Sequence, residues 1–401
     1  MMVDLLRVPF ALAILLLLCW FMSKDRAAIS WRLVLMGITL QILIAIAVLW
    51  FPPGQVVLQA ISSGVTSVID SSQVGAEFVF GEGFREHFIV FTIPATIIFF
   101  SMLMSLLYHF GIVQVVVRAM AAGMRRFMPV SGAESLAACA NVFIGNTEAP
   151  LMVKPYIVAM TRSELMAMMT AGMATISGGM LAVYIGMGAD PGYLVTASVM
   201  AAPASLVVAK ILQPETARPV TRSGNVEKLQ SDSVNMFQAM TKGASDGMFL
   251  AANVIAMLIA FVAMVALLNS LLGLAPDFAG EPLTLQRILG WLFYPFAVLI
   301  GIDLKDAASI GHLLGIKIFL TEFLAYSELN ALGDTISDRS RAIATFALCG
   351  FSSFISIGIQ VGGIGALVPE RKNDIASMGL TCMVGGSVVT LMTATIAGLF
   401  I

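Results

Sequence analysis

The chain has 401 residues, of which 59% are hydrophobic and 11% are charged, and its mean hydropathy is +0.93. A soluble protein of this size needs far more polar surface, so the composition predicts an all-α polytopic membrane protein. The formal net charge of −2 gives no indication of a nucleic-acid partner. The four cysteines and three histidines lack the spacing of a metal site or a disulfide framework, so no cofactor is predicted from them.

The N-terminal part contains apolar runs near the length of about 20 residues that a spanning helix needs. The loop after the first run carries Lys24, Arg26 and Arg32 against one acid, so the positive-inside tendency places it in the cytoplasm and the N-terminus outside. The expected elements are spans at 9–22, 33–51 and 88–110 and an amphipathic interfacial helix at 56–74.

A cluster of polar residues interrupts the apolar run at 131–156: Gly145-Asn146-Thr147-Glu148-Ala149-Pro150. A carboxylate inside a membrane costs about 3 kcal/mol even on lenient scales, and irregular backbone survives there only beside protein or cavity water. Basic residues flank the run on both sides, which predicts a re-entrant hairpin with its tip at 145–150. The alternative is that Glu148 lies in a surface loop between two helices.

A second Thr-Glu pair, Thr321-Glu322, lies in another apolar hairpin predicted over 288–326 and broken near 301–306. Each pair is followed by an apolar helix that Gly and hydroxyl residues interrupt, at 171–179 and at 349–356. Corresponding broken segments in two halves of a membrane chain indicate a transporter site at the interface of an internal repeat.

The remaining elements complete about eight transmembrane helices and two re-entrant hairpins of opposite orientation, with both termini outside. A capping box at 161–164 opens the fourth helix, and the polar stretch 214–242 divides the halves. The later spans are expected at 164–187, 193–212, 248–272, 341–359 and 375–401. The predicted regions are a scaffold (1–110), a first transport repeat (111–212), a cytoplasmic linker (213–247), a scaffold helix (248–275) and a second transport repeat (283–401).

The two hairpins and the broken helices bring acceptors and neutral donors together: Glu148 and Glu322 with Asn146, Thr147, Thr321, Ser353 and Ser356. No Arg or Lys is clearly placed for an anionic solute, and Lys317 is interpreted as structural. Carboxylates accept strong hydrogen bonds from O–H and N–H groups, so a neutral solute with hydroxyls or amides is predicted. Phe351 offers a face for a planar ring, or it packs in the core.

Asn141 and Thr175 supply neutral oxygens near the predicted helix breaks. Transporters hold Na⁺ with such oxygens and with unwound carbonyls. An interhelical hydrogen bond explains Asn141 equally well, so this pattern alone leaves both interpretations open.

Six segments, in order and at matching spacing, resemble the concentrative nucleoside transporters: GAEFVFG (75–81), GNTEAPL (145–151), AMLIAF (256–261), LTLQRILG (283–290), TEF (321–323) and ALCGF (347–351). The resemblance covers nearly the whole chain. It implies a homotrimer in a bacterial plasma membrane, with an inverted repeat and a scaffold in each protomer. It also implies an elevator-type movement that imports nucleosides by symport with sodium as the coupling ion, and no cofactor is expected.

Carried over by position, Asn146, Thr147 and Glu148 resemble the nucleobase contacts of the family, and Phe351 resembles the aromatic residue beside the base. Glu322, Ser353 and Ser356 fall where ribose is bound. The positions that resemble the sodium ligands are Asn141, Ile144, Thr175 and Ile176, the two isoleucines through backbone carbonyls. Proton-coupled relatives tend to lack the Asn, so Asn141 favours Na⁺.

This sequence also departs from the family pattern. Asn146 stands where Gln is common, Thr321 and Ser353 stand where Asn is usual, and Ile355 replaces Ser. A lost hydrogen bond is worth about 1 kcal/mol, so together these changes can alter the preferred solute. The alternatives are a carrier of the same fold that is coupled to protons or takes another neutral solute, such as a nucleobase or modified nucleoside.

An intramembrane enzyme is the alternative from another class, because two buried carboxylates can perform acid–base chemistry. The chain lacks a Gly-x-Ser-x-Gly elbow, a His-Glu-x-x-His pair and paired intramembrane Asp motifs. We therefore expect no enzymatic activity. A passive channel would need a continuous polar pore.

Overall fold

The computed structural model describes residues 2–223, 233–274, 276 and 282–401. Every regular element in these ranges is a helix, as the composition predicts. The middle of the predicted linker, 224–232, and the predicted external loop at 277–281 lie outside the described residues.

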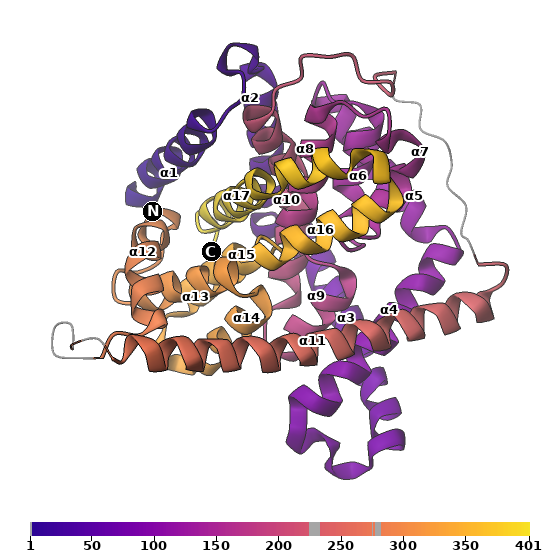
Figure 1. Cartoon of the computed structure of the whole chain (residues 1–401), viewed down its shortest axis with the longest axis vertical. Coiled ribbons are helices and arrows are strands. Elements are labelled where there is room, and N and C mark those ends of the chain that lie inside the picture. Colours follow the sequence, from indigo (N-terminus) through magenta and orange to yellow (C-terminus); the bar gives the residue numbers. More distant parts are fainter. Residues whose placement is uncertain (1, 224–232, 275, 277–281) are drawn as a thin grey trace.

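The N-terminal part matches the predicted order of elements. It contains α1 (Met2–Phe21), α2 (Trp31–Ala45) with a π-helical turn (Ile46–Trp50), α3 (Pro52–Phe80) and α4 (Ile93–His109). The predicted interfacial helix is longer than expected at both ends. It begins earlier because Pro52 occupies the first turn of α3, where proline is tolerated. The purple segment that joins α3 to α4 projects from the rest of the molecule (Figure 1).

The first predicted hairpin is present as two short arms around an irregular tip. Residues 141–148 form turns without regular helix between the arms. Its polar tip is therefore where the sequence places it. The elements from α5 onward are α5 (Ile112–Phe127), α6 (Gly132–Ala140), a 3₁₀ turn (Ala149–Val153), α7 (Lys154–Ile157), α8 (Arg162–Ala174), α9 (Gly178–Gly186) and α10 (Pro191–Leu212).

The second half differs from the prediction in where its hairpin lies. Its elements are α11 (Met236–Leu272), α12 (Leu285–Ile300), α13 (Ala307–Phe319), α14 (Glu322–Ala331), α15 (Asp338–Leu348), α16 (Phe354–Leu367) and α17 (Lys372–Ala397). The break at 301–306 separates α12 from α13, and Thr321-Glu322 lies at the turn between α13 and α14. The prediction of one hairpin over 288–326 was wrong because α12 is as apolar as a hairpin arm.

The same order of elements occurs twice. A long helix, a shorter helix, a hairpin, a broken helix and a final helix run from α4 to α10 and again from α11 to α17. Six helices in the described part of the chain are long and apolar enough to cross a membrane. The apolar part of α1, Leu6–Phe21, and the broken pair α15 and α16 account for the other two predicted spans.

Burial separates an inner bundle from peripheral helices. In the most apolar window of each helix, 89% of residues are buried in α8–α9 and in α10, against 11% in α11. The helix α11 runs along one side of the molecule, below α13 to α16 in the view of Figure 1. Its exposed side chains include Phe249, Ile259 and Leu267, an apolar surface suited to a membrane.

An ion cluster fastens the base of the first hairpin to α10. The Lys210 Nζ lies 2.7 Å from Glu134 Oε2 and 3.2 Å from Glu215 Oε2, and it donates a hydrogen bond to Ser163 Oγ at 2.9 Å. Glu134 also completes the capping box that begins α6. The cluster therefore joins the arm that leads to the tip with the helix that closes the repeat.

Replacing Lys210 with Met is expected to destabilise the fold by about 3–5 kcal/mol, because it leaves the buried Glu134 carboxylate without its cation. Lys242→Met on α11 is the matched control, since Lys242 is exposed and its loss should cost within about 0.5 kcal/mol. Unfolding of both variants in detergent measures the difference. Equal stability of the two variants would show that the cluster does not hold the hairpin.

Candidate functional site

One cavity lies where the two hairpins and the two helix breaks meet. It has an empty volume of about 820 Å³, including the space at its open mouth. All seven predicted solute-binding residues line it: Asn146, Thr147, Glu148, Glu322, Phe351, Ser353 and Ser356. Glu148 thus shares one cavity with Glu322, which favours the hairpin interpretation of this stretch over a separate surface loop.

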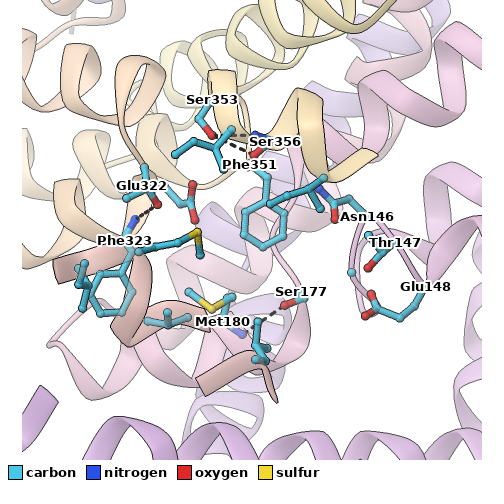
Figure 2. Close-up of a pocket in the computed structure, with 18 residues that line it drawn as sticks. Asn146, Thr147, Glu148, Ser177, Met180, Glu322, Phe323, Phe351, Ser353 and Ser356 are labelled. Carbon is cyan, nitrogen blue, oxygen red and sulfur yellow. Dashed lines mark hydrogen bonds between the residues drawn. The ribbon is translucent and has the colours of Figure 1, made fainter. Parts of the chain in front are cut away.

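The tip of the first hairpin forms one side of the cavity (Figure 2). Glu148 is an exposed residue of this tip, whereas Asn146 is 8% exposed and packs toward Gly172 of α8. A Cβ atom added to Gly145 would lie 2.2 Å from Glu148 Oε2. Glycine is therefore required here because the Glu148 carboxylate folds back against the backbone of its own tip.

Replacing Gly145 with Ala is expected to raise the KM for the transported solute by about tenfold or more, because the new methyl group displaces the Glu148 carboxylate by a clash worth over about 1.4 kcal/mol. Gly358→Ala is the matched control, since an added Cβ at Gly358 on α16 meets open space. Initial uptake rates over a range of solute concentrations give both values. A KM ratio below two would contradict the inferred position of the carboxylate.

The second hairpin presents Glu322 at the start of α14. Thr321 caps this helix, and its Oγ1 accepts a hydrogen bond from the Phe323 N–H at 3.2 Å. Glu322 is 5% exposed, and its Oε1 accepts a hydrogen bond from Tyr184 Oη at 2.9 Å. One carboxylate oxygen is therefore fixed by the protein.

Tyr184 belongs to the site although the sequence analysis did not single it out. Its ring stacks on Tyr326 with centroids 4.3 Å apart, and Tyr326 Oη donates a hydrogen bond to the Thr345 carbonyl at 2.7 Å. The one signal in the sequence is a tyrosine within the apolar half-helix that follows the first break. Its partner Glu322 is 138 positions away, so the contact itself was not predictable from spacing.

The break between α15 and α16 supplies the third side. Figure 2 shows the Phe351 ring between Glu322 and the hairpin-1 residues Asn146 to Glu148. The Ser353 and Ser356 hydroxyls are 2.9 Å apart at the start of α16. The Phe351 N–H donates a hydrogen bond to the Thr175 carbonyl at 3.2 Å, so the two helix breaks are joined directly.

The α11 helix closes the cavity with an apolar wall. The residues it contributes are Leu250, Val254, Met257 and Leu258. No described residue that lines the cavity is Lys or Arg. The cavity thus combines two carboxylates, hydroxyls, an amide and an aromatic ring with apolar surface, which suits a neutral solute that has a planar ring and several hydroxyl or N–H donors.

Asn141 lies beside this cavity at the end of α6 and is 1% exposed. Its Nδ2 donates to the Ala137 carbonyl in its own helix at 2.9 Å, and no described residue donates a hydrogen bond to its Oδ1. The helical bond accounts for the amide nitrogen but leaves the buried oxygen unpaired. An unpaired buried oxygen fits a cation ligand, since leaving it unpaired is costly.

The other predicted ion ligands lie at the tip and at the first break. Thr175 ends α8, and its Oγ1 donates to the Ala171 carbonyl at 2.9 Å, so its lone pairs are available. The Phe143 carbonyl accepts from the Gly178 N–H at 3.1 Å, which holds the stretch with Ile144 against the stretch with Ile176. The four predicted ion ligands therefore lie in two segments that contact each other, one at the hairpin tip and one at the first helix break.

Gln360 of α16 is a further polar residue that the sequence analysis missed. It is fully buried, its Nε2 donates to the Met169 carbonyl at 3.0 Å, and its Oε1 has no hydrogen-bond partner among the described residues. A Cβ added to Gly172 would lie 2.6 Å from the Gln360 amide nitrogen and 3.4 Å from Asn141 Oδ1. Two buried amides with unpaired oxygens thus lie beside Gly172.

Comparison with family models assigns most of the chain. Residues 10–83 match the Na⁺ dependent nucleoside transporter N-terminus, and residues 193–398 match the corresponding C-terminus. Residues 90–191 match a model described as nucleoside recognition.

Known relatives extend over almost the full chain. The nucleoside permease NupC of Helicobacter pylori is 39% identical, with 97% of this chain and 96% of the permease aligned. Human solute carrier family 28 member 3 is 39% identical over 96% of this chain, but the chain spans only 58% of that protein. A solved structure of CNTnw in an inward-facing, substrate-bound state is similar with a TM-score of 0.93 and 38% identity, covering 99% of this chain and 98% of CNTnw.

Proposed function

Because this chain belongs to the family of Na⁺ dependent nucleoside transporters, we propose that it imports nucleosides across a membrane together with sodium. The observation that carries the proposal is the single cavity that Glu148 and Glu322 share with Phe351 between them. The NupC relative is a nucleoside permease, and a rat relative of 38% identity is a sodium/nucleoside cotransporter. We propose transport and no enzymatic activity.

In the proposed complex, the nucleobase lies against the Phe351 ring and is bound by Asn146, Thr147 and Glu148. The ribose hydroxyls donate to Glu322 and hydrogen-bond with Ser353 and Ser356. The arrangement in Figure 2 supports this division, since Glu322 and the serines are drawn on one side of Phe351 and the hairpin-1 residues on the other. The Tyr184 bond leaves the second oxygen of Glu322 for the solute.

The proposed sodium ligands are Asn141 through its side chain, Thr175, and the carbonyls of Ile144 and Ile176. Sodium would supply positive charge at the ends of α6 and α8, where helix carbonyls lack partners. The unpaired Asn141 Oδ1 supports this assignment. These residues link the first hairpin to the first break, so ion binding orders the tip that carries Asn146 to Glu148.

The proposed movement is of the elevator type, in which the two transport repeats, α5–α10 and α12–α17, carry the solute past a scaffold. The wall from α11 supports this division, because its cavity-facing residues are apolar and make no side-chain hydrogen bonds that a sliding movement would have to break. The predicted regions, 1–110 and 248–275 for the scaffold and 111–212 and 283–401 for transport, remain a proposal. We also propose that the protein is a homotrimer in a bacterial inner membrane, in contact with its lipid, and that both termini lie outside.

A solute competition assay tests the substrate class. Purified protein is reconstituted in liposomes, and labelled uridine uptake is measured against an excess of nucleosides, nucleobases and free ribose. Competition by nucleosides alone supports the proposal, and absence of any nucleoside uptake refutes it. Ser353 and Ile355 line the cavity and point to a second candidate of the same fold, a carrier of nucleobases or modified nucleosides. Stronger competition by those solutes than by uridine itself would identify it.

A further inference from the structure

The only lysine in α13, Lys317, is 2% exposed although it lies in the last turn of an apolar helix. Its Nζ donates hydrogen bonds to the Ala347 carbonyl at 2.8 Å and to Thr390 Oγ1 at 2.7 Å. The Thr390 hydroxyl donates to the Ser387 carbonyl at 3.0 Å, so it accepts from the ammonium. Both bonds of Lys317 therefore end on oxygens of other helices.

The Ala347 carbonyl is in the last turn of α15, just before the second helix break. Its neighbours Phe346 and Leu348 accept hydrogen bonds from the Cys349 and Gly350 N–H groups. Helix ends leave carbonyls without intrahelical partners and favour positive charge. Lys317 thus supplies a cation to the C-terminal end of α15.

Lys317 and the proposed ion site lie at equivalent places in the two repeats. In the second repeat, Lys317 joins the first arm of the hairpin, α13, to the end of the helix before the break, α15. In the first repeat, Asn141 and Thr175 lie at the ends of the equivalent helices, α6 and α8. The α6 helix contains no Lys or Arg, and Asn141 Oδ1 is unpaired.

We propose that Lys317 is a tethered cation which takes, in the second repeat, the place that the mobile coupling ion takes in the first. It is a positioning residue: it holds the α15–α16 break against the second hairpin and thereby orients Glu322, Phe351 and Ser353. Lys317 lies in the last turn of α13, and Glu322 begins the helix that follows, so the two residues flank the turn of the second hairpin. The inference rests on the proposed sodium-coupled transport.

The test compares Lys317→Met, which keeps the length but removes the charge, with Lys317→Asn, which leaves room for an ion. In proteoliposomes, Lys317→Met is expected to raise the solute KM about tenfold while the half-saturating Na⁺ concentration stays within twofold. Lys317→Asn is expected to make the Na⁺ dependence steeper, with the Hill coefficient rising by up to one, because an added ion replaces the ammonium. If Lys317 were merely structural, both variants would have a lower maximal rate, with the solute KM and the Na⁺ dependence unchanged.

Unchanged solute KM and unchanged Na⁺ dependence in both folded variants would overturn the proposal. If neither variant folds, Thr390→Val decides, because it removes one acceptor of Lys317 and keeps the charge. A several-fold higher solute KM in Thr390→Val supports the proposal, and a KM within twofold overturns it. Wild-type protein without Na⁺-dependent uptake would instead show that the proposed function has failed.

Discussion

The Glu322→Gln variant is expected to lose uptake by about a hundredfold at low solute concentration. A hydrogen bond to a charged group is worth about 1.5–3 kcal/mol, and the amide cannot accept on both atoms as the carboxylate does. The protein already occupies one oxygen of Glu322 through Tyr184, so the other is available for a hydroxyl of the solute. Labelled uridine uptake by proteoliposomes measures the loss.

Glu328→Gln is the matched control for this variant, because Glu328 lies on the same helix but pairs with His312 at 2.7 Å outside the cavity lining. Its uptake should stay near that of the wild type. Glu148→Gln on the other hairpin should lose uptake as Glu322→Gln does, with normal expression. If either cavity variant takes up uridine as the wild type does, the carboxylate that it lacks does not bind the solute.

The second large effect is expected for the ion ligands. Thr175→Val should raise the half-saturating Na⁺ concentration about tenfold or more, because it removes an oxygen ligand without changing the size of the side chain. Thr175→Ser is its matched control, since it keeps the hydroxyl that bonds to the Ala171 carbonyl. Asn141→Leu should weaken the Na⁺ dependence of uptake more than Thr175→Val does, because it removes the side-chain oxygen that has no partner.

Initial uptake rates at varied Na⁺ and fixed solute give these values, with choline replacing Na⁺ to hold ionic strength. If Thr175→Val and Thr175→Ser respond to Na⁺ alike, the hydroxyl is not a ligand. If Asn141→Leu keeps the wild-type Na⁺ dependence, the unpaired oxygen does not bind the ion and the proposed ion site is wrong.

The hairpin tips could be located from the sequence because polar residues within apolar runs are costly unless they face a cavity or a partner. Glu148 and Glu322 line one cavity as predicted, and Ser353 begins α16 as a cap at the break. The membrane class followed from composition alone. These features depend on local sequence, so a single chain is enough to predict them.

Features that depend on contacts between distant segments could not be predicted in this way. The extent of the second hairpin was missed because hydropathy does not distinguish α12 from α13. Tyr184, Gln360 and the α11 wall are ordinary residues of apolar helices until the fold brings them to the site. Lys317 was interpreted as structural, and only its bonds to α15 and α17 indicate a role.

Sodium-driven accumulation of uridine in proteoliposomes tests the central claim most directly. With a Na⁺ gradient directed into the liposomes, the internal uridine concentration should rise above the external one, and it should not do so when Na⁺ is equal on both sides or replaced by choline. The same accumulation without a Na⁺ gradient would contradict the coupling of the shared carboxylate cavity to the ion site at Asn141 and Thr175.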